Sequence, residues 1–193
     1  MARKTTISKE IILDAALKML IRDGYSSINI KTLAAEIGCS TQPIVWHFDN
    51  MESFRKALAL YALEYSKPKR KPKDAIKQFE NLGKAFIKMA VREPNLFCFL
   101  YLDISPNVKP YKLNNFPLSI GEGNMVSGIA EQTGLSKAKA TSCIQNTIVY
   151  SHGLATMIAS GVIKISEKKA MAMIKNASEI FVLGERLDQN DKK

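Results

Sequence analysis

Residues 29–48 read NIKTLAAEIGCSTQPIVWHF, and this stretch decides the fold. Asn29 suits the N-cap of a helix because its side chain can accept hydrogen bonds from the unpaired amides of the next turn. Gly38 suits the other end of that helix because glycine enters the left-handed conformation without a steric penalty. Between these two residues the apolar positions recur at helical spacing. They are Ile30, Leu33, Ala34 and Ile37.

A second short helix is expected over residues 41–47, directly after Ser40. Two short helices joined by a turn that contains glycine predict a helix-turn-helix. The second helix has polar and aromatic side chains rather than a strong apolar stripe, as a helix in the major groove of DNA does. Gln42 can form two hydrogen bonds with adenine, and the methyl group of Thr41 can contact that of thymine. Pro43 fits the first turn, where its missing amide costs nothing.

Two residues at the end of the second helix, Trp46 and His47, can each have one of two roles. His47 either donates a hydrogen bond to a DNA phosphate or packs and caps within the small domain. Trp46, the only tryptophan of the chain, either contacts the groove or packs under the first helix, and we favour exposure. Phe48 is expected to pack inside the domain.

The N-terminal domain is expected over residues 1–50, with a connecting helix to about residue 66. An apolar stripe in residues 7–22 predicts its first helix. The basic arm at Arg3 and Lys4 either touches phosphate or is solvated. The prolines of KPKRKPK, residues 67–73, interrupt a helix, so this segment is either a solvated joint or a flanking phosphate contact.

The rest of the chain, residues 67–193, is expected to form a larger C-terminal domain. Helical patterns cover residues 74–92, 95–104, 125–134, 136–161 and 166–187, whereas residues 105–124 read as an irregular segment. No alternating strand pattern is visible. The expected fold class is therefore all-α, with a three-helix N-terminal domain and a C-terminal domain of five or six helices.

Composition restricts the function. The formal net charge of the 193 residues is +10, and residues 1–73 hold 13 Lys and Arg against seven Asp and Glu. A basic balance favours polyanionic partners such as nucleic acid. The cysteines, Cys39, Cys98 and Cys143, lie far apart, and no signal-peptide pattern follows Met1, so we expect a cytoplasmic protein. The uncharged residues 147–163 are short for a bilayer span, so we expect no membrane partner.

Enzymatic chemistry has little support in this sequence. The chain holds two histidines, and its cysteines and histidines form no metal-type cluster. Neither a phosphate-binding loop, a dinucleotide-binding glycine motif nor a nucleophile elbow is visible. We therefore expect no enzyme activity, no metal and no cofactor.

The helix-turn-helix motif resembles the one found in a known protein family. Gly24-Tyr25, Asn29-Ile30-x-x-Leu33-Ala34, Gly38-x-Ser40 and Ile44-x-x-His47-Phe48 resemble the DNA-binding domain of TetR/AcrR-type transcriptional regulators. The resemblance implies a homodimer that binds a palindromic operator in double-stranded DNA and is released by a small-molecule inducer. The DNA-contacting residues expected from the motif and the resemblance are Asn29, Lys31, Ser40, Thr41, Gln42, Pro43, Val45, Trp46 and His47.

Two positions depart from the family pattern. TetR-like proteins usually have Tyr at the position of Val45 and often have Lys at the position of Met51, and both residues contact phosphate. The first expectation is a ligand-responsive repressor. The alternative is a helical small-molecule-binding dimer whose N-terminal domain has lost sequence-specific DNA binding.

The resemblance also places a ligand pocket between helices of the C-terminal domain, where residues 150–155 (YSHGLA) partly match a helix motif of one TetR branch. Few of the candidate residues are charged, so an apolar or aromatic ligand is expected, although aromatic and Met residues at such positions are usually core. The expected ligand-binding residues are Phe86, Met89, Phe97, Tyr101, Tyr111, Phe116, Met125, Tyr150, His152 and Met157.

The last helix carries small residues at intervals of seven, which allow a second helix to approach closely. The resemblance implies that the two C-terminal helices of each chain form a four-helix dimer interface. The expected interface residues are Ala170, Ile174, Ala177, Phe181 and Gly184.

Overall fold

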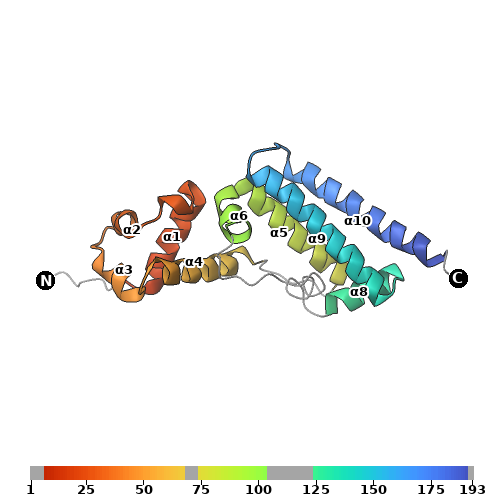
Figure 1. The fold of residues 1–193 in the computed structure, drawn as a ribbon, viewed down its shortest axis with the longest axis horizontal. Helices are drawn as coiled ribbons and strands as arrows, with labels where there is room; N and C mark the ends of the chain where they lie inside the picture. The colour runs from red at the N-terminus through yellow and green to blue at the C-terminus, as the bar shows by residue number, and fades with distance from the viewer. Residues whose placement is uncertain (1–6, 68–73, 104–123, 191–193) are drawn as a thin grey trace. The chain divides into compact units, whose positions relative to one another are not determined.

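The computed structural model describes residues 7–67, 74–103 and 124–190, and within these ranges all regular structure is helical, which confirms the all-α class. None of the helices in these ranges is long and apolar enough to cross a membrane. The elements are α1 (Lys9–Asp23), the 3₁₀ turn η1 (Tyr25–Ser27), α2 (Ile30–Ile37), α3 (Gln42–His47), α4 (Met51–Ser66), α5 (Ala75–Arg92), α6 (Pro94–Tyr101), α8 (Asn124–Thr133), α9 (Lys137–Ala159) and α10 (Glu167–Asn190) (Figure 1).

The chain folds as two compact units. The N-terminal unit comprises residues 1–67 and 93–104, and the C-terminal unit comprises residues 68–92 and 105–193. In this division α6 belongs with the N-terminal helices and not with the C-terminal ones. The reason is that α6 packs against α1 and α4. Its apolar side chains need cover on most sides, and Leu96, Phe97 and Phe99 are all buried.

The N-terminal unit is built on α1 and α4. Ser8 caps α1 through a hydrogen bond that its Oγ accepts from the Ile11 amide (3.3 Å). Asn50 caps α4, because its Oδ1 accepts from the Ser53 amide at 2.9 Å. Both helices bury apolar residues at helical spacing, and the two helices pack against each other. These buried residues are Ile12, Leu13, Ala16, Leu17, Met19 and Leu20 in α1, and Phe54, Leu58 and Ala62 in α4.

The C-terminal unit packs α5, α8 and α10 around α9. α8 approaches α5 so closely that a Cβ atom at Gly128 would lie 2.5 Å from the Cβ of Ala75, so glycine is needed there. Two buried hydroxyl groups of α9 form hydrogen bonds with backbone carbonyls of the same helix. Thr147 Oγ1 donates to the Cys143 carbonyl (2.8 Å), and Ser151 Oγ donates to the Thr147 carbonyl (2.6 Å). The core cluster is Met125, Ile129, Ala130, Leu135, Ala140, Cys143 and Ile144.

Candidate nucleic-acid interface

The helix-turn-helix begins with a complete capping box at α2. The Asn29 Oδ1 accepts from the amides of Lys31 (2.9 Å) and Thr32 (3.0 Å), and the Thr32 hydroxyl accepts from the Asn29 amide (2.9 Å). This arrangement uses the Asn29 carboxamide oxygen inside the protein. Lys31, which follows Ile30 in the first turn, is exposed.

The turn between the two helices depends on Gly38. Its φ of 75° and ψ of 36° place it in the left-handed region, and its amide donates to the Ala34 and Ala35 carbonyls. No atom outside its chain neighbours lies within 4 Å of where a Cβ would stand. The conformation, and not the space, therefore favours glycine at this position.

The second helix starts one residue later than expected. α3 begins at Gln42, with Thr41 as a helical-region N-cap whose side chain makes no capping hydrogen bond, and Pro43 stands in the first turn. Ser40 does not cap α3. The hydroxyls of Ser40 and Thr41 are on exposed residues, and Gln42 is exposed beside them. The N-terminal end of α3 thus presents polar groups outward, as direct reading of base edges requires.

One face of α3 is buried and the other is open to solvent. Ile44 is buried, whereas Val45 is 53% and Trp46 is 74% exposed. The favoured exposure of Trp46 is therefore confirmed. Phe48, the residue after α3, is buried edge-to-face against Phe54 of α4 (centroids 5.1 Å apart). This packing fixes α3 at its base and leaves Val45 and Trp46 facing outward.

His47 has a structural contact in this unit. Its Nε2 lies 2.9 Å from the carbonyl oxygen of Ile7, so the ring donates to the backbone just before α1. That nitrogen is used within the protein, which favours the packing and capping interpretation over donation to phosphate. Lys9 supports the same corner, with its Nζ 5.2 Å from the centre of the Phe48 ring.

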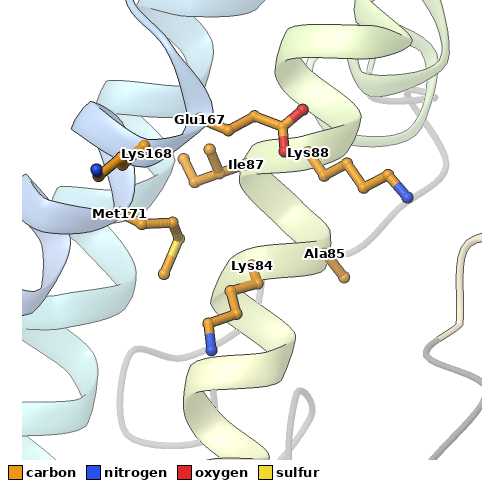
Figure 2. Close-up of a pocket in the computed structure, with 7 residues that line it drawn as sticks. All are labelled: Lys84, Ala85, Ile87, Lys88, Glu167, Lys168 and Met171. Atoms are coloured by element: carbon orange, nitrogen blue, oxygen red, sulfur yellow. The ribbon is translucent and has the colours of Figure 1, made fainter.

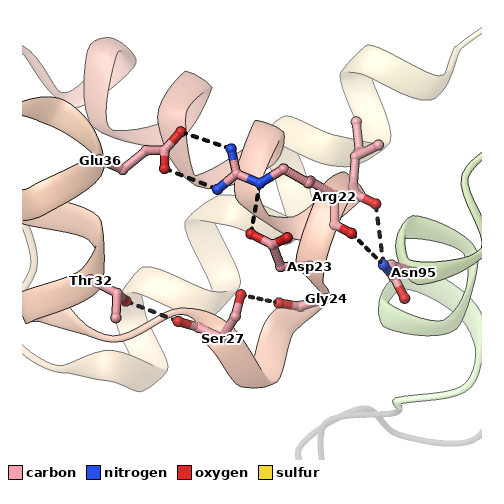
Figure 3. Close-up of polar contacts among 8 residues, drawn as sticks. Arg22, Asp23, Gly24, Ser27, Thr32, Glu36 and Asn95 are labelled. Atoms are coloured by element: carbon pink, nitrogen blue, oxygen red, sulfur yellow. Dashed lines mark hydrogen bonds and ion pairs between the residues drawn. The ribbon is translucent and has the colours of Figure 1, made fainter.

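A polar network braces α1, α2 and α6 (Figure 3). Arg22 donates two hydrogen bonds to the Glu36 carboxylate (3.0 and 3.2 Å) and a third to Asp23 (2.8 Å). The pair lowers the pKa of the Glu36 carboxyl. Asn95 of α6 donates to the Ile21 and Arg22 carbonyls at the end of α1 (3.2 and 3.4 Å). The network therefore ties the last turn of α1 both to α2 and to α6.

Sequence reasoning missed Arg55 of α4 as an organising residue. Its guanidinium lies 4.5 Å from the Tyr25 ring centre and 5.1 Å from that of Phe99, and it donates to the Asp103 carbonyl (2.9 Å). The two rings stack at 5.0 Å. No local pattern indicates this cluster, because its members come from η1, α4 and α6 and meet only in the folded unit.

The expected ligand-binding residues do not form one cluster. Tyr111 and Phe116 lie outside the described residues. Phe97 and Tyr101 stand together in the N-terminal unit (ring centroids 5.2 Å), whereas the expectation placed them in the C-terminal domain. In the C-terminal unit Phe86 and His152 form a ring pair, with centroids 5.8 Å apart.

The remaining ligand candidates divide by burial. Met89 and Met125 are buried, and Met125 belongs to the core cluster. Tyr150 is half-buried. Met157 is exposed at the surface of α9. The core alternative therefore accounts for Met89 and Met125, because stripes of large apolar residues pack helices together.

The expected dimer stripe of α10 mostly faces its own unit. Ala170 and Ile174 are buried, Phe181 packs against the core cluster, Ala177 is half-buried, and only Gly184 is exposed. The exposed apolar residues of α10 lie on another face. They are Ile180, Leu183 and Leu187, and the neighbouring α9 exposes Val149 and Met157. The stripe of small residues therefore packs α10 onto its own chain, where α9 is the main partner.

The comparisons with known proteins agree with this geometry. Residues 12–58 match the model of the bacterial regulatory proteins of the tetR family. An uncharacterized HTH-type transcriptional regulator of Mycobacterium tuberculosis (strain ATCC 25618 / H37Rv) is 32% identical over 63 residues, which are 33% of this chain and 29% of that protein. The likeness to this relative thus covers less than a third of its length.

A solved structure has a fold similar to that of this chain over most of its length. A TetR variant from Acinetobacter baumannii AYE, crystallised with minocycline, has a TM-score of 0.53 at 17% identity, over 93% of this chain and 97% of that one. A TetR transcriptional regulator from Rhodococcus sp. RHA1 has a TM-score of 0.49 at 14% identity, over 89% and 93%. The first likeness extends the shared fold beyond the matched domain. Residues 12–58 thus form a helix-turn-helix domain similar to that of the tetR family of bacterial regulatory proteins.

Proposed function

We propose that the protein is a dimeric, ligand-responsive repressor that binds a palindromic operator through α3. The observation that carries this proposal is the exposure of Trp46 and Val45 on a short helix whose other face is fixed by Ile44 and Phe48. A large exposed apolar surface on a rigid element marks a site of interaction. In the major groove these side chains would contact thymine methyl groups, while Gln42 would read a base edge.

Phosphate contacts would come from the surroundings of α3. Lys31 is exposed, and the hydroxyls of Ser40 and Thr41 stand on exposed residues just before α3. Phosphate contacts position the protein on the duplex, while base contacts give specificity. Val45 cannot donate a hydrogen bond, so Lys31 and the two hydroxyls carry more of this role in our proposal.

Dimerisation would use the exposed faces of α9 and α10. Ile180, Leu183 and Leu187 repeat at helical spacing and are each more than half exposed. Val149 and Met157 continue the apolar surface on α9. A two-fold dimer would present two copies of α3, and a roughly palindromic site with half-sites about one helical turn or more apart follows from that symmetry.

The inducer would bind in the C-terminal unit near Phe86 and His152. Burial lowers the pKa of His152, so its imidazole stays neutral at pH 7 and can both donate and accept a hydrogen bond. Its ring pair with Phe86 offers an aromatic surface. An apolar or aromatic inducer with one polar group fits this pair best.

A second candidate function rests on Val45. The alternative is a small-molecule-binding dimer without sequence-specific DNA binding. Val45 faces outward on α3 beside Trp46, and its side chain has no group that could form a hydrogen bond with DNA. In that case binding to DNA would come from the net charge alone and would fade steeply as salt rises.

The deciding experiment is selection of genomic fragments by the purified protein at about 0.15 M salt, followed by sequencing. We expect an enriched inverted repeat. Trp46→Ala should abolish the enrichment, whereas Leu60→Ala, which removes a comparably exposed apolar side chain from α4 (69%), should retain it. Retention of the enrichment by Trp46→Ala would contradict the role proposed for the exposed face of α3. The absence of any enriched sequence with the native protein would contradict DNA reading itself and favour the second candidate.

A further inference from the structure

A groove of about 340 Å³ lies between α5 and α10 in the C-terminal unit, and neither the helix-turn-helix nor the Phe86–His152 pair contributes to its lining (Figure 2). Its floor is apolar and consists of Ala85, Ile87 and Met171. Figure 2 shows Met171 and Lys84 directed toward the gap between the two helices. We name this feature the α5–α10 groove.

Helical spacing places cations around this floor. Lys84 and Lys88 are four residues apart on α5, with Ile87 between them, and Lys168 lies three residues before Met171 on α10. Residues three and four apart share a helix face. Long lysine side chains keep their amines in solvent while their stems cover apolar surface, so the three amines can turn toward a bound anion.

The positive charge of the groove is not balanced by its one acidic residue. The Glu167 carboxylate pairs with Arg92 and is thereby neutralised, and the same pair raises the pKa of Arg92. Lys84 is 4.0 Å from the Glu80 carboxylate, a loose contact. Among the described residues no ion pair is formed by Lys88 or Lys168. An anion in the groove would therefore meet uncompensated cations.

We propose that the α5–α10 groove binds a small organic anion, with a carboxylate or sulfonate on an apolar body of one to three rings. The volume is at the lower end of the range of about 300–1,000 Å³ for small-molecule sites, which excludes a folded partner segment of several turns. The apolar floor takes the body, and the flexible side chains of Lys84, Lys88 and Lys168 would turn their amines from solvent toward the anionic group. This site is additional to the inducer site proposed above and does not depend on DNA binding.

The test uses two probes that share one apolar body. 8-Anilino-1-naphthalenesulfonate carries a sulfonate, and N-phenyl-1-naphthylamine is its neutral counterpart. Fluorescence titration of the native chain should show saturable binding of the sulfonate, at least about tenfold tighter than that of the neutral probe. Equal affinities for the two probes would overturn the proposal, because the cations would then contribute nothing.

A matched pair of variants locates the cations. Lys84→Gln, Lys88→Gln and Lys168→Gln combined should weaken the sulfonate at least about tenfold. The control combines Lys77→Gln, Lys137→Gln and Lys175→Gln, which removes the same charge from positions of the same unit outside the groove. The control should change the affinity by less than about twofold. Equal weakening by both sets would show a general charge effect and would overturn the site.

Methyl NMR locates the apolar body. The chain has eight methionines, and Met171→Leu assigns the methyl signal of Met171. Ring currents from the bound sulfonate should shift the Met171 signal most. The largest shift at Met89, Met125 or Met157 instead would place the probe elsewhere and would contradict the proposal.

Discussion

Trp46 and Phe48 lie two positions apart and face opposite environments, so substitution separates binding from folding. Phe48→Ala removes a buried ring packed against Phe54 and should lower the free energy of unfolding by about 3–5 kcal/mol. Trp46→Ala should change it by no more than about 0.5 kcal/mol, because that side chain is exposed. Urea unfolding followed by far-ultraviolet circular dichroism measures both. Similar losses in the two variants would show that Trp46 is a packing residue after all.

His152 makes stability depend on pH. Burial lowers its pKa in the folded chain, so the unfolded chain takes up the proton first, near the ordinary value of about 6.5. The stabilisation is complete above that pH and is lost as the pH falls through it, because protons then favour the unfolded state. We expect the urea midpoint of the native protein to fall as the pH is lowered from about 7.5 to about 5.5.

His152→Gln should reduce this fall relative to the native protein, because the variant lacks the buried imidazole. The range from about pH 7.5 to about 5.5 is above the titration of ordinary carboxyl groups, which keeps them out of the comparison. The same pH dependence in His152→Gln and the native protein would show that His152 does not contribute.

At the scale of the elements, two glycines should respond to alanine in opposite directions. Gly38 has a left-handed conformation in the turn, so Gly38→Ala should cost about 1–2 kcal/mol of stability even though space is available. Gly83 lies inside α5, where no neighbouring side chain comes within 4 Å of the place that a Cβ would occupy, so Gly83→Ala should add about 0.5–1 kcal/mol. Thermal unfolding of both variants checks the signs. A gain at Gly38 would mean that the turn adapts.

The helices are predictable where the signals are local. Ser8, Asn29, Asn50 and Ser136 cap the helices that follow them, and each side chain accepts a hydrogen bond from the first turn. A cap and an apolar period need only neighbouring residues, so the sequence contains them. α3 starts at Gln42, one residue later than expected. Thr41 is the N-cap residue: its backbone dihedral angles are helical, but its side chain makes no capping hydrogen bond.

The partners of the helices are not predictable in the same way. An apolar stripe indicates that a helix packs, but it does not indicate against what. The stripe through Ala170 and Ile174 is expected to meet a second chain and instead packs inside its own unit. Likewise, the apolar sequence of α6 indicates that this helix is buried. It does not indicate the contacts with α1 and α4, because these helices are far from α6 in the sequence.

At the scale of the whole molecule, the proposed dimer can be tested at α10. Leu183→Glu places a charge in the exposed apolar face and should convert a dimer to a monomer, because a charge in such an interface loses its hydration. Val162→Glu, at an exposed residue after α9 (69%), is the matched control and should remain dimeric. Sedimentation velocity measures the mass of each. A dimer in Leu183→Glu would place the interface elsewhere.

The N-terminal unit is assembled from two separate pieces of chain, residues 1–67 and 93–104, and α5 of the other unit comes between them in the sequence. A gene exchange with a single breakpoint near residue 67 would therefore transfer the helix-turn-helix without α6, and the faces of α1 and α4 that α6 covers would have to fit a foreign helix. Asn95 and Phe99, which meet the end of α1 and the Tyr25 ring, would be left behind. Recombination that replaces the helix-turn-helix of this chain at low cost should thus exchange α2 and α3 alone, or carry both pieces together.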